Sequence, residues 1–531
     1  MSFYGERVRI SASFLRKGAA AFICVLFSLP VSARRYHISE VTYALERTRE
    51  DALARNVDVD TDRIFESREE LDSYLADLNQ RILNTRVFQD ALCDVRPVPD
   101  GDGEDGITEL SLRIEATDSR HLLILPYPKY DSNDGLILKI KIKDVNFLGT
   151  MSVLDAGIFA GIKEDAESGD QNPTFGAEFS YRHPFTLGPF LGSWNNNLDF
   201  QYTCGARELE FWSGTGLTFE LPFKKLSIVL DVSERANRDL EYEEFGDTGH
   251  LTSEMRLSVP VKILEIGDWG TLFWTPFTDG KVSYDKDGIN HHNDDLASPV
   301  VCAGQALSAS RIDWHGNFRT GLSAKIGHSA GYDFMQKEIE RQVFGEILLF
   351  KGFGFIAFST RLTAFMTKSN RSLVGGLVRG VRDKQRYLND THKALKTPSA
   401  IVLNADIPVH LITTDWAAWT ERIFGAGSGI AEILSWTGKF NFELQAAPFI
   451  DIALTKNEMT GRLFSPKDGW YTGGIEFLVF PERWKGIVIR GSFGVDFGRA
   501  LASKKFPDKI DMGWRENVKK YEIYAGIGLH Y

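Results

Sequence analysis

The feature that most constrains this chain is a two-residue alternation of apolar and polar side chains, which recurs from residue 135 to the end. In the first run, every second residue from Leu136 to Ile142 is aliphatic, and lysines occupy most positions between them. Successive side chains of a strand point to opposite faces, so each run predicts a strand with one apolar face. No stretch of this region has the roughly 18 apolar residues of a membrane-spanning helix.

Seventeen such runs can be recognised. They cover residues 135–148, 151–162, 174–185, 194–204, 213–224, 225–236, 250–263, 269–286, 299–313, 315–331, 339–351, 353–367, 398–411, 438–456, 469–480, 484–498 and 519–531. Tilted strands of about 9 to 11 residues cross a membrane when the sheet closes on itself. A barrel whose two ends share one side needs an even strand count, so one run is expected to be wrong, around 194–236 or 339–367. We predict an all-β transmembrane barrel of about 16 antiparallel strands over residues 135–531.

Residues 1–33 have the pattern of a cleavable export signal. A basic region ending at Arg16 and Lys17 precedes the apolar run Gly18 to Leu29, and the small-x-small sequence Val31 to Ala33 follows. An uncleaved anchor is disfavoured because about 12 apolar residues are too few to span a bilayer. We therefore predict export, with cleavage after Ala33.

Charge and cysteine spacing exclude several classes of function. The net charge of −11 disfavours nucleic-acid binding, which requires a basic surface. After cleavage Cys93, Cys204 and Cys302 remain, too widely spaced for a disulfide framework or a zinc site, and whether any two pair stays open. The densest polar cluster, His291 to Asp295, has no serine elbow beside it. No P-loop occurs, and we expect no enzymatic activity, cofactor or metal.

Residues 34–125 predict a small α+β module, followed by a linker at 126–134. The expected elements are a strand at 36–43, a helix from Thr48, a helix from Ser67, and a hairpin of strands at 87–95 and 110–114. Ser67 and Glu70 form a capping box at the second helix, whose apolar residues recur at helical spacing. The predicted order is β-α-α-β-β.

A long polar segment at 368–397 separates two of the predicted strands and contains Val378, Arg379 and Gly380. By alternation, Asp451 lies on the polar face of its strand, which faces the lumen. The other polar residues assigned to the lumen are Asp406, Glu443, Glu476, Arg490 and Asp496. A guanidinium on an inward-folded loop could pair with Asp451 in a partly desolvated contact. The alternative is that Arg379 is a solvated loop charge.

These motifs carry a specific resemblance. Val378-Arg379-Gly380 resembles the V-R-G-[YF] motif in the inward-folded sixth extracellular loop of the BamA-type superfamily of outer-membrane insertases and secretion pores. Leu403 to Pro408 and Pro448 to Ala453 resemble the two strands after that loop, and Asp144 to Thr150 resembles the D-x-N-x-x-G element at the end of the first barrel strand. The N-terminal module resembles a polypeptide-transport-associated (POTRA) domain.

The resemblance implies an outer-membrane protein of the BamA/TamA-like class, with its POTRA-like domain in the periplasm. It implies unfolded outer-membrane or secreted clients, periplasmic or lipoprotein partners, and contact with the lipid bilayer. A weak seam between the first and last strands is expected, with Ile140 on the first strand and Gly526 and Gly528 on the last. The aromatic C-terminal residue, Tyr531, resembles the end of a barrel-recognition signal on the apolar face of that strand.

Alternatives remain at two points. The scaffold could instead serve as a passive pore or surface antigen. An aromatic-rich insertion between Trp416 and Trp436 could be an amphipathic helix at the membrane interface or a loop packed on the barrel rim, and the sequence favours neither.

Overall fold

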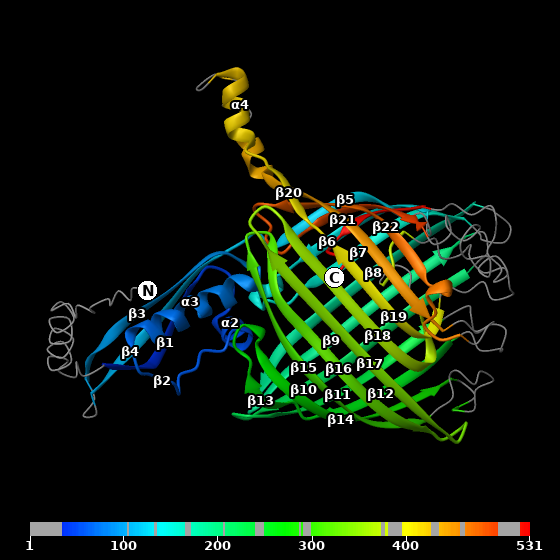
Figure 1. Cartoon of the computed structure of the whole chain (residues 1–531), viewed down its shortest axis with the longest axis horizontal. Coiled ribbons are helices and arrows are strands. Elements are labelled where there is room, and N and C mark those ends of the chain that lie inside the picture. Colours follow the sequence, from blue (N-terminus) through cyan, green and yellow to red (C-terminus); the bar gives the residue numbers. More distant parts are fainter. Residues whose placement is uncertain are drawn as a thin grey trace, which may run out of the picture. The chain divides into compact units, whose positions relative to one another are not determined.

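The computed structural model (Figure 1) describes the chain from residue 34 to its end, with several gaps. The described residues are 34–102, 106–131, 135–164, 171–204, 208–238, 249–285, 288–289, 299–372, 377–380, 396–425, 429, 435–456, 462–497 and 521–531. The predicted signal at 1–33 and the cluster His291 to Asp295 lie outside them. The chain divides into two compact units: Met1–Ala44, Asp58–Asn79 and Leu92–Glu115 form one, and the remaining residues form the other.

The N-terminal elements include those that the sequence predicts. They are β1 (Arg35–Leu45), α2 (Glu50–Asn56), β2 (Ile64–Phe65), α3 (Arg68–Asn84), β3 (Phe88–Asp102) and β4 (Ile107–Asp118), in a sheet of order β2-β1-β4-β3. At the start of α3 the Glu70 amide donates to Ser67 Oγ at 3.1 Å, as a capping box requires. The Glu70 carboxylate accepts from the Glu66 amide at 2.9 Å. The two-residue strand β2 was not predicted, because it is too short to show an alternation.

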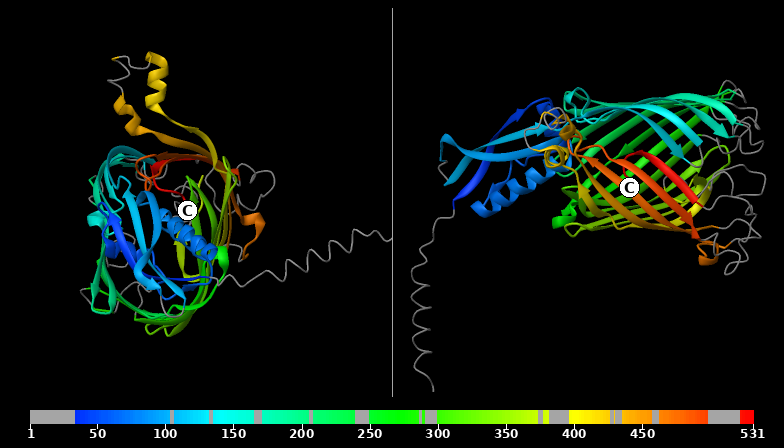
Figure 2. Two further views of the ribbon diagram at one scale, coloured as in Figure 1. Left: turned by 90° about the vertical axis from the view of Figure 1, so that its left-hand side faces the viewer. Right: turned by 90° about the horizontal axis from the view of Figure 1, so that it is seen from above.

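The remaining strands form the barrel (Figures 1 and 2). They are β5 (Leu122–Asp131), β6 (Gly135–Asp144), β7 (Leu154–Glu164), β8 (Gln171–Leu187), β9 (Phe190–Thr203), β10 (Glu208–Pro222), β11 (Ser227–Arg238), β12 (Gly249–Ser258), β13 (Val261–Glu265), β14 (Thr271–Tyr284), β15 (Val300–His315), β16 (Phe318–Asp333), β17 (Glu338–Gly352), β18 (Ala357–Ser372), β19 (Lys396–Asp406), β20 (Val409–Thr413), β21 (Phe442–Thr455), β22 (Trp470–Pro481), β23 (Ile489–Asp496) and β24 (Tyr521–Ile527). All strand pairs around the barrel are antiparallel.

The barrel has more strands than we predicted. Both β12 and β13 pair with β14, and both β19 and β20 pair with β21, so each of these two pairs occupies one barrel position. The described residues therefore fill eighteen positions. Each of the seventeen predicted runs contains a strand, and the reduction to sixteen was wrong: the even number is reached by adding β5.

The interpretation of residues 126–134 as a linker was therefore also wrong. Strand β5 pairs with β6 without interruption from Leu122–Asp144 to Asp131–Gly135. Two prolines, Pro126 and Pro128, hid this strand in the sequence, because proline normally argues against a strand that is paired on both sides.

The hydrogen-bond phase places both prolines on the outer edge of β5. The Val145 amide donates to the His121 carbonyl at 3.0 Å, and this pair continues the β5–β6 register by one step. Because hydrogen-bonded pairs alternate in an antiparallel ladder, odd-numbered residues of β5 bond to β6. Pro126 and Pro128 therefore lie on the edge of β5 on which β24 pairs, and neither offers an N–H donor there.

The junction of β5 with β24 is correspondingly short. Among the described residues of these strands, Tyr524 and Asp131 are the one Cα pair. On its other edge, β24 pairs with β23 continuously from Tyr521–Val495 to Ile527–Ile489. We refer to the β5–β24 junction as the seam.

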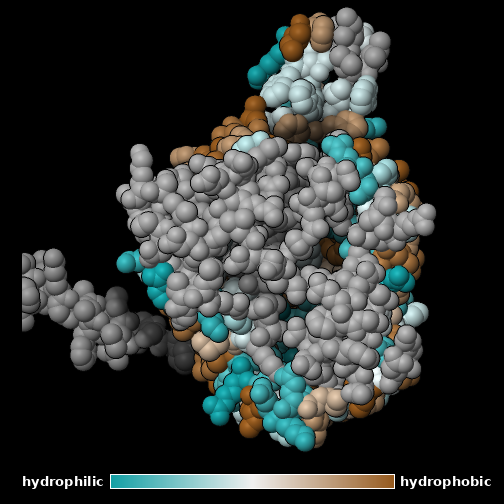
Figure 3. Space-filling model, turned by 90° about the vertical axis from the view of Figure 1, so that its right-hand side faces the viewer, coloured by the Kyte–Doolittle hydropathy of each residue, from teal (hydrophilic) through white to brown (hydrophobic). Residues whose placement is uncertain are grey.

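The outer wall of the barrel is apolar. Ile326, Ile339 and Ile158, on three different strands, are 60%, 64% and 59% exposed. Figure 3, which looks onto one end, shows hydrophobic side chains at several places around the flank. Among the described residues, no helix is both long and apolar enough to cross a bilayer.

Candidate functional site

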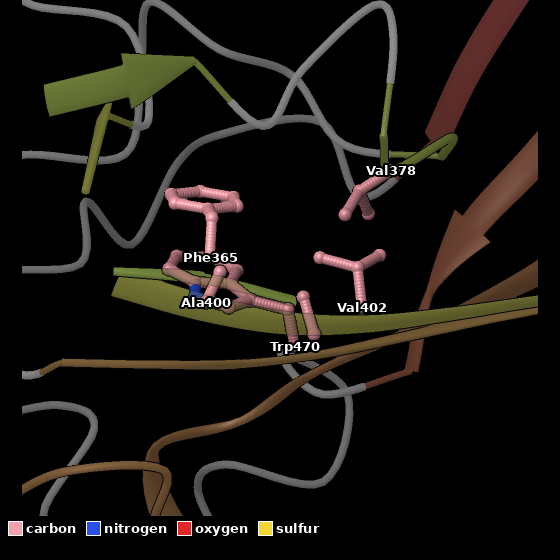
Figure 4. Packing of buried hydrophobic residues seen from close by; sticks show 6 residues of the cluster. Phe365, Val378, Ala400, Val402 and Trp470 are labelled. Carbon is pink, nitrogen blue, oxygen red and sulfur yellow. The ribbon is translucent and has the colours of Figure 1, made fainter. Parts of the chain in front are cut away.

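The described part of the long loop, residues 377–380, lies inside the barrel. Val378 is fully buried and belongs to a cluster with two aromatic and three aliphatic side chains of the wall (Figure 4). The buried members of this cluster are Phe365 of β18, Ala400 and Val402 of β19, Ala453 of β21 and Trp470 of β22. The side chain of Val378 thus holds the loop against four strands of the barrel wall.

Arg379 makes a bidentate contact with Asp451 beside this cluster. Its Nε and Nη2 atoms donate to the two carboxylate oxygens at 3.0 and 2.8 Å, and its backbone amide donates to Oδ2 at 2.8 Å. Asp451 is completely buried, and Arg379 is 6% exposed. The structure thus brings together the loop arginine and the lumen carboxylate that the sequence paired, rather than leaving Arg379 in solvent.

Two further carboxylates share the guanidinium. Nη1 of Arg379 lies 2.7 Å from Asp406 Oδ1 and 3.5 Å from Glu476 Oε2. Arg490 lies 3.8 Å from Glu476, so a second cation offsets part of the negative charge. The guanidinium also stacks 3.8 Å from the centre of the Phe449 ring. Removing one partner from such a buried group leaves uncompensated charge, which costs about 3 to 5 kcal/mol.

Gly380 has a geometric reason to be glycine. Its φ is +77°, a region that other residues rarely adopt. It also lies against the backbone of Gly494, where an added Cβ on Gly494 would come 2.7 Å from Gly380 Cα. The Gly380 amide donates to the carboxylate of Glu522 on β24. The motif therefore connects the loop to the last strand of the barrel.

The end of the chain turns into the lumen. Strand β24 ends at Ile527, and Gly528, at a φ of +109°, changes the direction of the chain. Leu529 then packs on a buried cluster that includes Leu478 and Phe480. The Gly528 amide donates to the Val488 carbonyl at 2.8 Å. Gly528 thus permits the kink that the sequence suggested, whereas Gly526 leaves room for the Tyr524 side chain.

Tyr531 ends beside the arginine. Its hydroxyl donates to Asp406 and lies 3.1 Å from the Ser359 carbonyl, and its backbone oxygen accepts from Arg319 Nη1 at 2.7 Å. The prediction that Tyr531 continues the apolar outer face of β24 is therefore wrong in this structure, because the alternation stops at Gly528. We refer to Arg379, Asp406, Asp451, Glu476 and Tyr531 as the lumen network.

The D-x-N-x-x-G element forms a separate buried junction within the second unit. Asn146 is 1% exposed, and its amide nitrogen donates to Thr48 Oγ1 at 2.8 Å and to Asp118 Oδ1 at 3.3 Å. Asp144 accepts from the Asn146 amide at 2.9 Å. Gly149 has a φ of +72°, and a Cβ there would collide with the Arg47 carbonyl. This motif therefore positions the first barrel hairpins rather than the loop.

The remaining predicted residues are dispersed. Asp496 is 1% exposed on β23, as expected for a lumen residue. Glu443 lies away from the lumen network and accepts from Asn317 Nδ2 at 2.8 Å. Ile140 was predicted to lie on the seam, but it pairs with Pro126 and Ile158 on the second strand of the barrel. The error follows directly from the missed strand β5.

The opposite wall of the lumen leaves a polar cavity of about 820 Å³. It is lined mainly by charged and amide side chains of β6 to β14, among them Lys141, Asp155, Glu178 and Arg235. Lys141 lies 2.6 Å from Asp155 and 3.1 Å from Glu178, so the basic face of β6 is paired within the lumen. The loop segment and this cavity thus occupy different sides of the barrel.

The sequence analysis assigned Asp406 and Glu476 to the lumen without pairing them with Arg379, and it did not place Glu522, Arg319 or Tyr531 at this site. Glu522 had one available signal, since it alternates with the apolar residues of β24 and is 7% exposed. Nothing in the alternation indicates where the chain goes after Gly528.

No protein-family model and no curated protein sequence matches the chain. Among solved structures, CdiB from Acinetobacter baumannii is similar over 93% of this chain and 74% of its own, with 9% identity and a TM-score of 0.49. BamA from Haemophilus ducreyi, lacking POTRA domains 1-3, is similar over 92% and 84%, with 11% identity and a TM-score of 0.37. CdiB from Escherichia coli is similar over 94% and 92%, with 8% identity and a TM-score of 0.36. These are likenesses of fold, and residue roles are argued from this chain's own geometry.

Proposed function

We propose that this protein is an exported outer-membrane barrel of the BamA/TamA-like class, which assists the insertion or translocation of client proteins. The observation that carries the proposal is the unequal attachment of β24. Its lumen side is held through Glu522 and Tyr531, whereas its edge towards β5 has one residue pair among the residues that the structure describes. The proposed role requires no covalent chemistry.

In this mechanism the seam opens by movement of β5 while β24 stays in place. Separation of the two strands loses little, because Pro126 and Pro128 offer no donors to β24. An opened seam presents unpaired strand edges to an unfolded client, which can pair with them by strand addition. The lumen network then keeps β24 in register while the client folds.

The N-terminal module fits the role of a POTRA-like periplasmic domain. In the part of the chain that the structure describes, its sheet ends in β3, which pairs with β4 alone and so offers an edge for an extended peptide or a partner protein. We propose that clients, and periplasmic or lipoprotein partners, meet the chain at this module.

A passive pore or surface antigen on the same scaffold is the second candidate, and the 820 Å³ polar cavity favours it. The two are separated in vesicles that contain the full chain. An eight-stranded outer-membrane barrel diluted from urea should fold faster into these vesicles than into empty ones. Unaltered folding together with steady single-channel conductance would instead support the passive pore.

A further inference from the structure

The insertion between β20 and β21 projects from one end of the barrel. The Thr414 amide donates to the Phe442 carbonyl at 2.9 Å and closes the base of the insertion. The Glu482 amide donates to the Asn441 carbonyl at 2.9 Å, which places this base beside the β22–β23 turn. The same turn accepts the Gly528 amide, so the insertion lies at the barrel end where the chain terminates.

The described part of the insertion consists of α4 (Trp416–Phe424) and the 3-10 helix η5 (Ser435–Phe440). Asp415 caps α4 by accepting from the Ala418 amide at 3.0 Å. Trp416 joins the two helices: its ring Nε1 donates to the Phe440 carbonyl at 3.3 Å. The ring also meets Trp419 edge-on at a centroid distance of 5.1 Å. The insertion thus has local structure of its own.

One face of α4 is apolar, and the described residues cover it only in part, where Trp416 contacts η5 and Phe442. Trp416, Trp419 and Ile423 recur at helical spacing, and Glu421 and Arg422 lie on the other face. No residue of α4 is buried, and Ile423 is 73% exposed. A loop packed on the barrel rim would bury this face, so that interpretation does not hold for the described residues.

The exposed aromatic side chains continue onto the barrel wall. Trp436 and Phe440 of η5 are 52% and 55% exposed. At the base of the insertion, the outward-facing Leu411 of β20 is 50% exposed, and Phe355 in the neighbouring β17–β18 turn is 67% exposed. The His410 amide donates to the Phe355 carbonyl at 2.8 Å, so this turn lies against β20. Exposed apolar side chains are therefore present on the insertion and on the barrel wall at its base.

We propose that α4 and η5 lie in the interface of the phospholipid leaflet at this end of the barrel. Tryptophan and phenylalanine beside Arg422 and Lys439 are the combination that favours the boundary between acyl chains and headgroups. The exposed apolar residues at the base of the insertion favour lipid over a protein partner as its occupant. This inference rests on the proposed function only in placing the barrel in a bilayer.

The test uses the full chain with Cys24, Cys93, Cys204 and Cys302 replaced by serine and one new cysteine labelled with a polarity-sensitive fluorophore. Ile423→Cys reports the apolar face of α4, Glu421→Cys its polar face, and Leu411→Cys the barrel wall. Vesicles contain phosphatidylethanolamine and phosphatidylglycerol, with or without brominated acyl chains. We expect bromolipid to quench the label at 423 and 411 at least about twofold more than the label at 421.

Each other outcome overturns a different statement. Quenching at 411 but not at 423 overturns the interfacial helix and leaves the barrel in the membrane. Protection of the label at 423 from aqueous iodide without bromolipid quenching would overturn the inference and show that the helix packs against the protein itself. No quenching at 411 would contradict the membrane placement and, with it, this inference. A triple variant, Ile423→Ser, Phe424→Ser and Trp436→Ser, labelled at Thr420→Cys, should lose the quenching while the barrel remains resistant to unfolding by detergent.

Discussion

The two sides of β24 are held in contrasting ways. Towards the lumen, the strand is connected through Glu522 and the chain that follows it to a buried network around Arg379. Towards β5, the described residues form one pair, and Pro126 and Pro128 leave this edge of β5 without two donors. The contrast teaches that a barrel can have a weak junction without a loosely held last strand, because the interior supplies the attachment that the sheet does not.

The strongest test of the interior attachment is Arg379→Ala. It leaves Asp451 and Asp406 buried without their cation, and we expect a loss of about 3 to 5 kcal/mol in the stability of the loop's attachment. The measurement is the rate of proteolysis within 373–395 in the folded barrel. Arg235→Ala is the control, because Arg235 is half-exposed and 3.7 Å from Glu254, a contact worth at most about 1 kcal/mol.

A charge exchange sharpens the same prediction. Arg379→Asp combined with Asp451→Arg should recover part of the protease resistance, because the pair is restored in reverse. Unchanged proteolysis in Arg379→Ala would contradict the anchoring role of the pair.

Tyr531→Phe tests the second attachment of β24. The substitution removes the hydroxyl that donates to Asp406, and a hydrogen bond to a charged group contributes about 1.5 to 3 kcal/mol. We expect a lower temperature for the heat-induced mobility shift of the barrel in detergent gels. Tyr471→Phe is the control, since its hydroxyl makes an exposed bond of 2.8 Å to the Pro466 carbonyl. Equal shifts in both variants would exclude a special role for Tyr531.

Replacing Pro126 and Pro128 by valine tests the weak side. Both substitutions return an N–H donor to this edge of β5, and position 128 lies opposite Ile527 of β24, where one new bond is worth about 0.5 to 1.5 kcal/mol. We expect a more heat-resistant barrel that promotes client folding less well. Tyr127→Val changes a residue whose amide faces β6, so it should leave the seam unaltered. Faster client folding in the proline variant would argue against opening at this junction.

The smallest predicted effect lies outside the barrel, in the pairing of His37 with Glu109 at 2.8 Å. The hydrogen bond to Glu109 raises the pKa of His37 above 6.5. Its stabilisation is therefore complete below the pKa of the unfolded chain and is lost as pH rises through the higher folded value. The difference in the free energy of unfolding by urea between the wild type and His37→Gln should shrink from about pH 5 to about pH 8.5, and it should stay below about 1 kcal/mol because the pair is partly exposed.

The alternation of side chains predicted which strand residues face the lumen. It did not predict the contacts that the chain makes after it leaves the sheet. Asp451 and Glu476 could be assigned to the lumen because every second residue of a strand faces it. The position of Tyr531 could not, because the positive φ of Gly528 redirects the chain and alternation carries no information beyond that point. Glycine in a sequence permits such a turn without requiring it.

The sequence predicted a weak seam between the first and last strands of the barrel, but it placed this seam at β6 and not at β5. Prolines lower the strand signal, so β5 was interpreted as a linker and Ile140 of β6 was placed at the junction. The same two prolines then explain why the pairing is short, which became apparent only once the register with β6 was known. Pro126 and Pro128 thus have two effects: they lower the strand signal of β5 in the sequence, and they remove donors from the edge of β5 that is not paired with β6.

The central claim is that the seam must open for clients to be inserted, and one crosslink tests it most directly. Asp131→Cys and Tyr524→Cys place cysteines at the paired position, in a chain lacking Cys24, Cys93, Cys204 and Cys302. The control is Ala303→Cys with Ala330→Cys, a paired position in the continuous β15–β16 ladder. We predict that oxidation abolishes the accelerated folding of an eight-stranded client barrel in the seam variant only, and that reduction restores it. Full activity of the oxidised seam variant would contradict the claim.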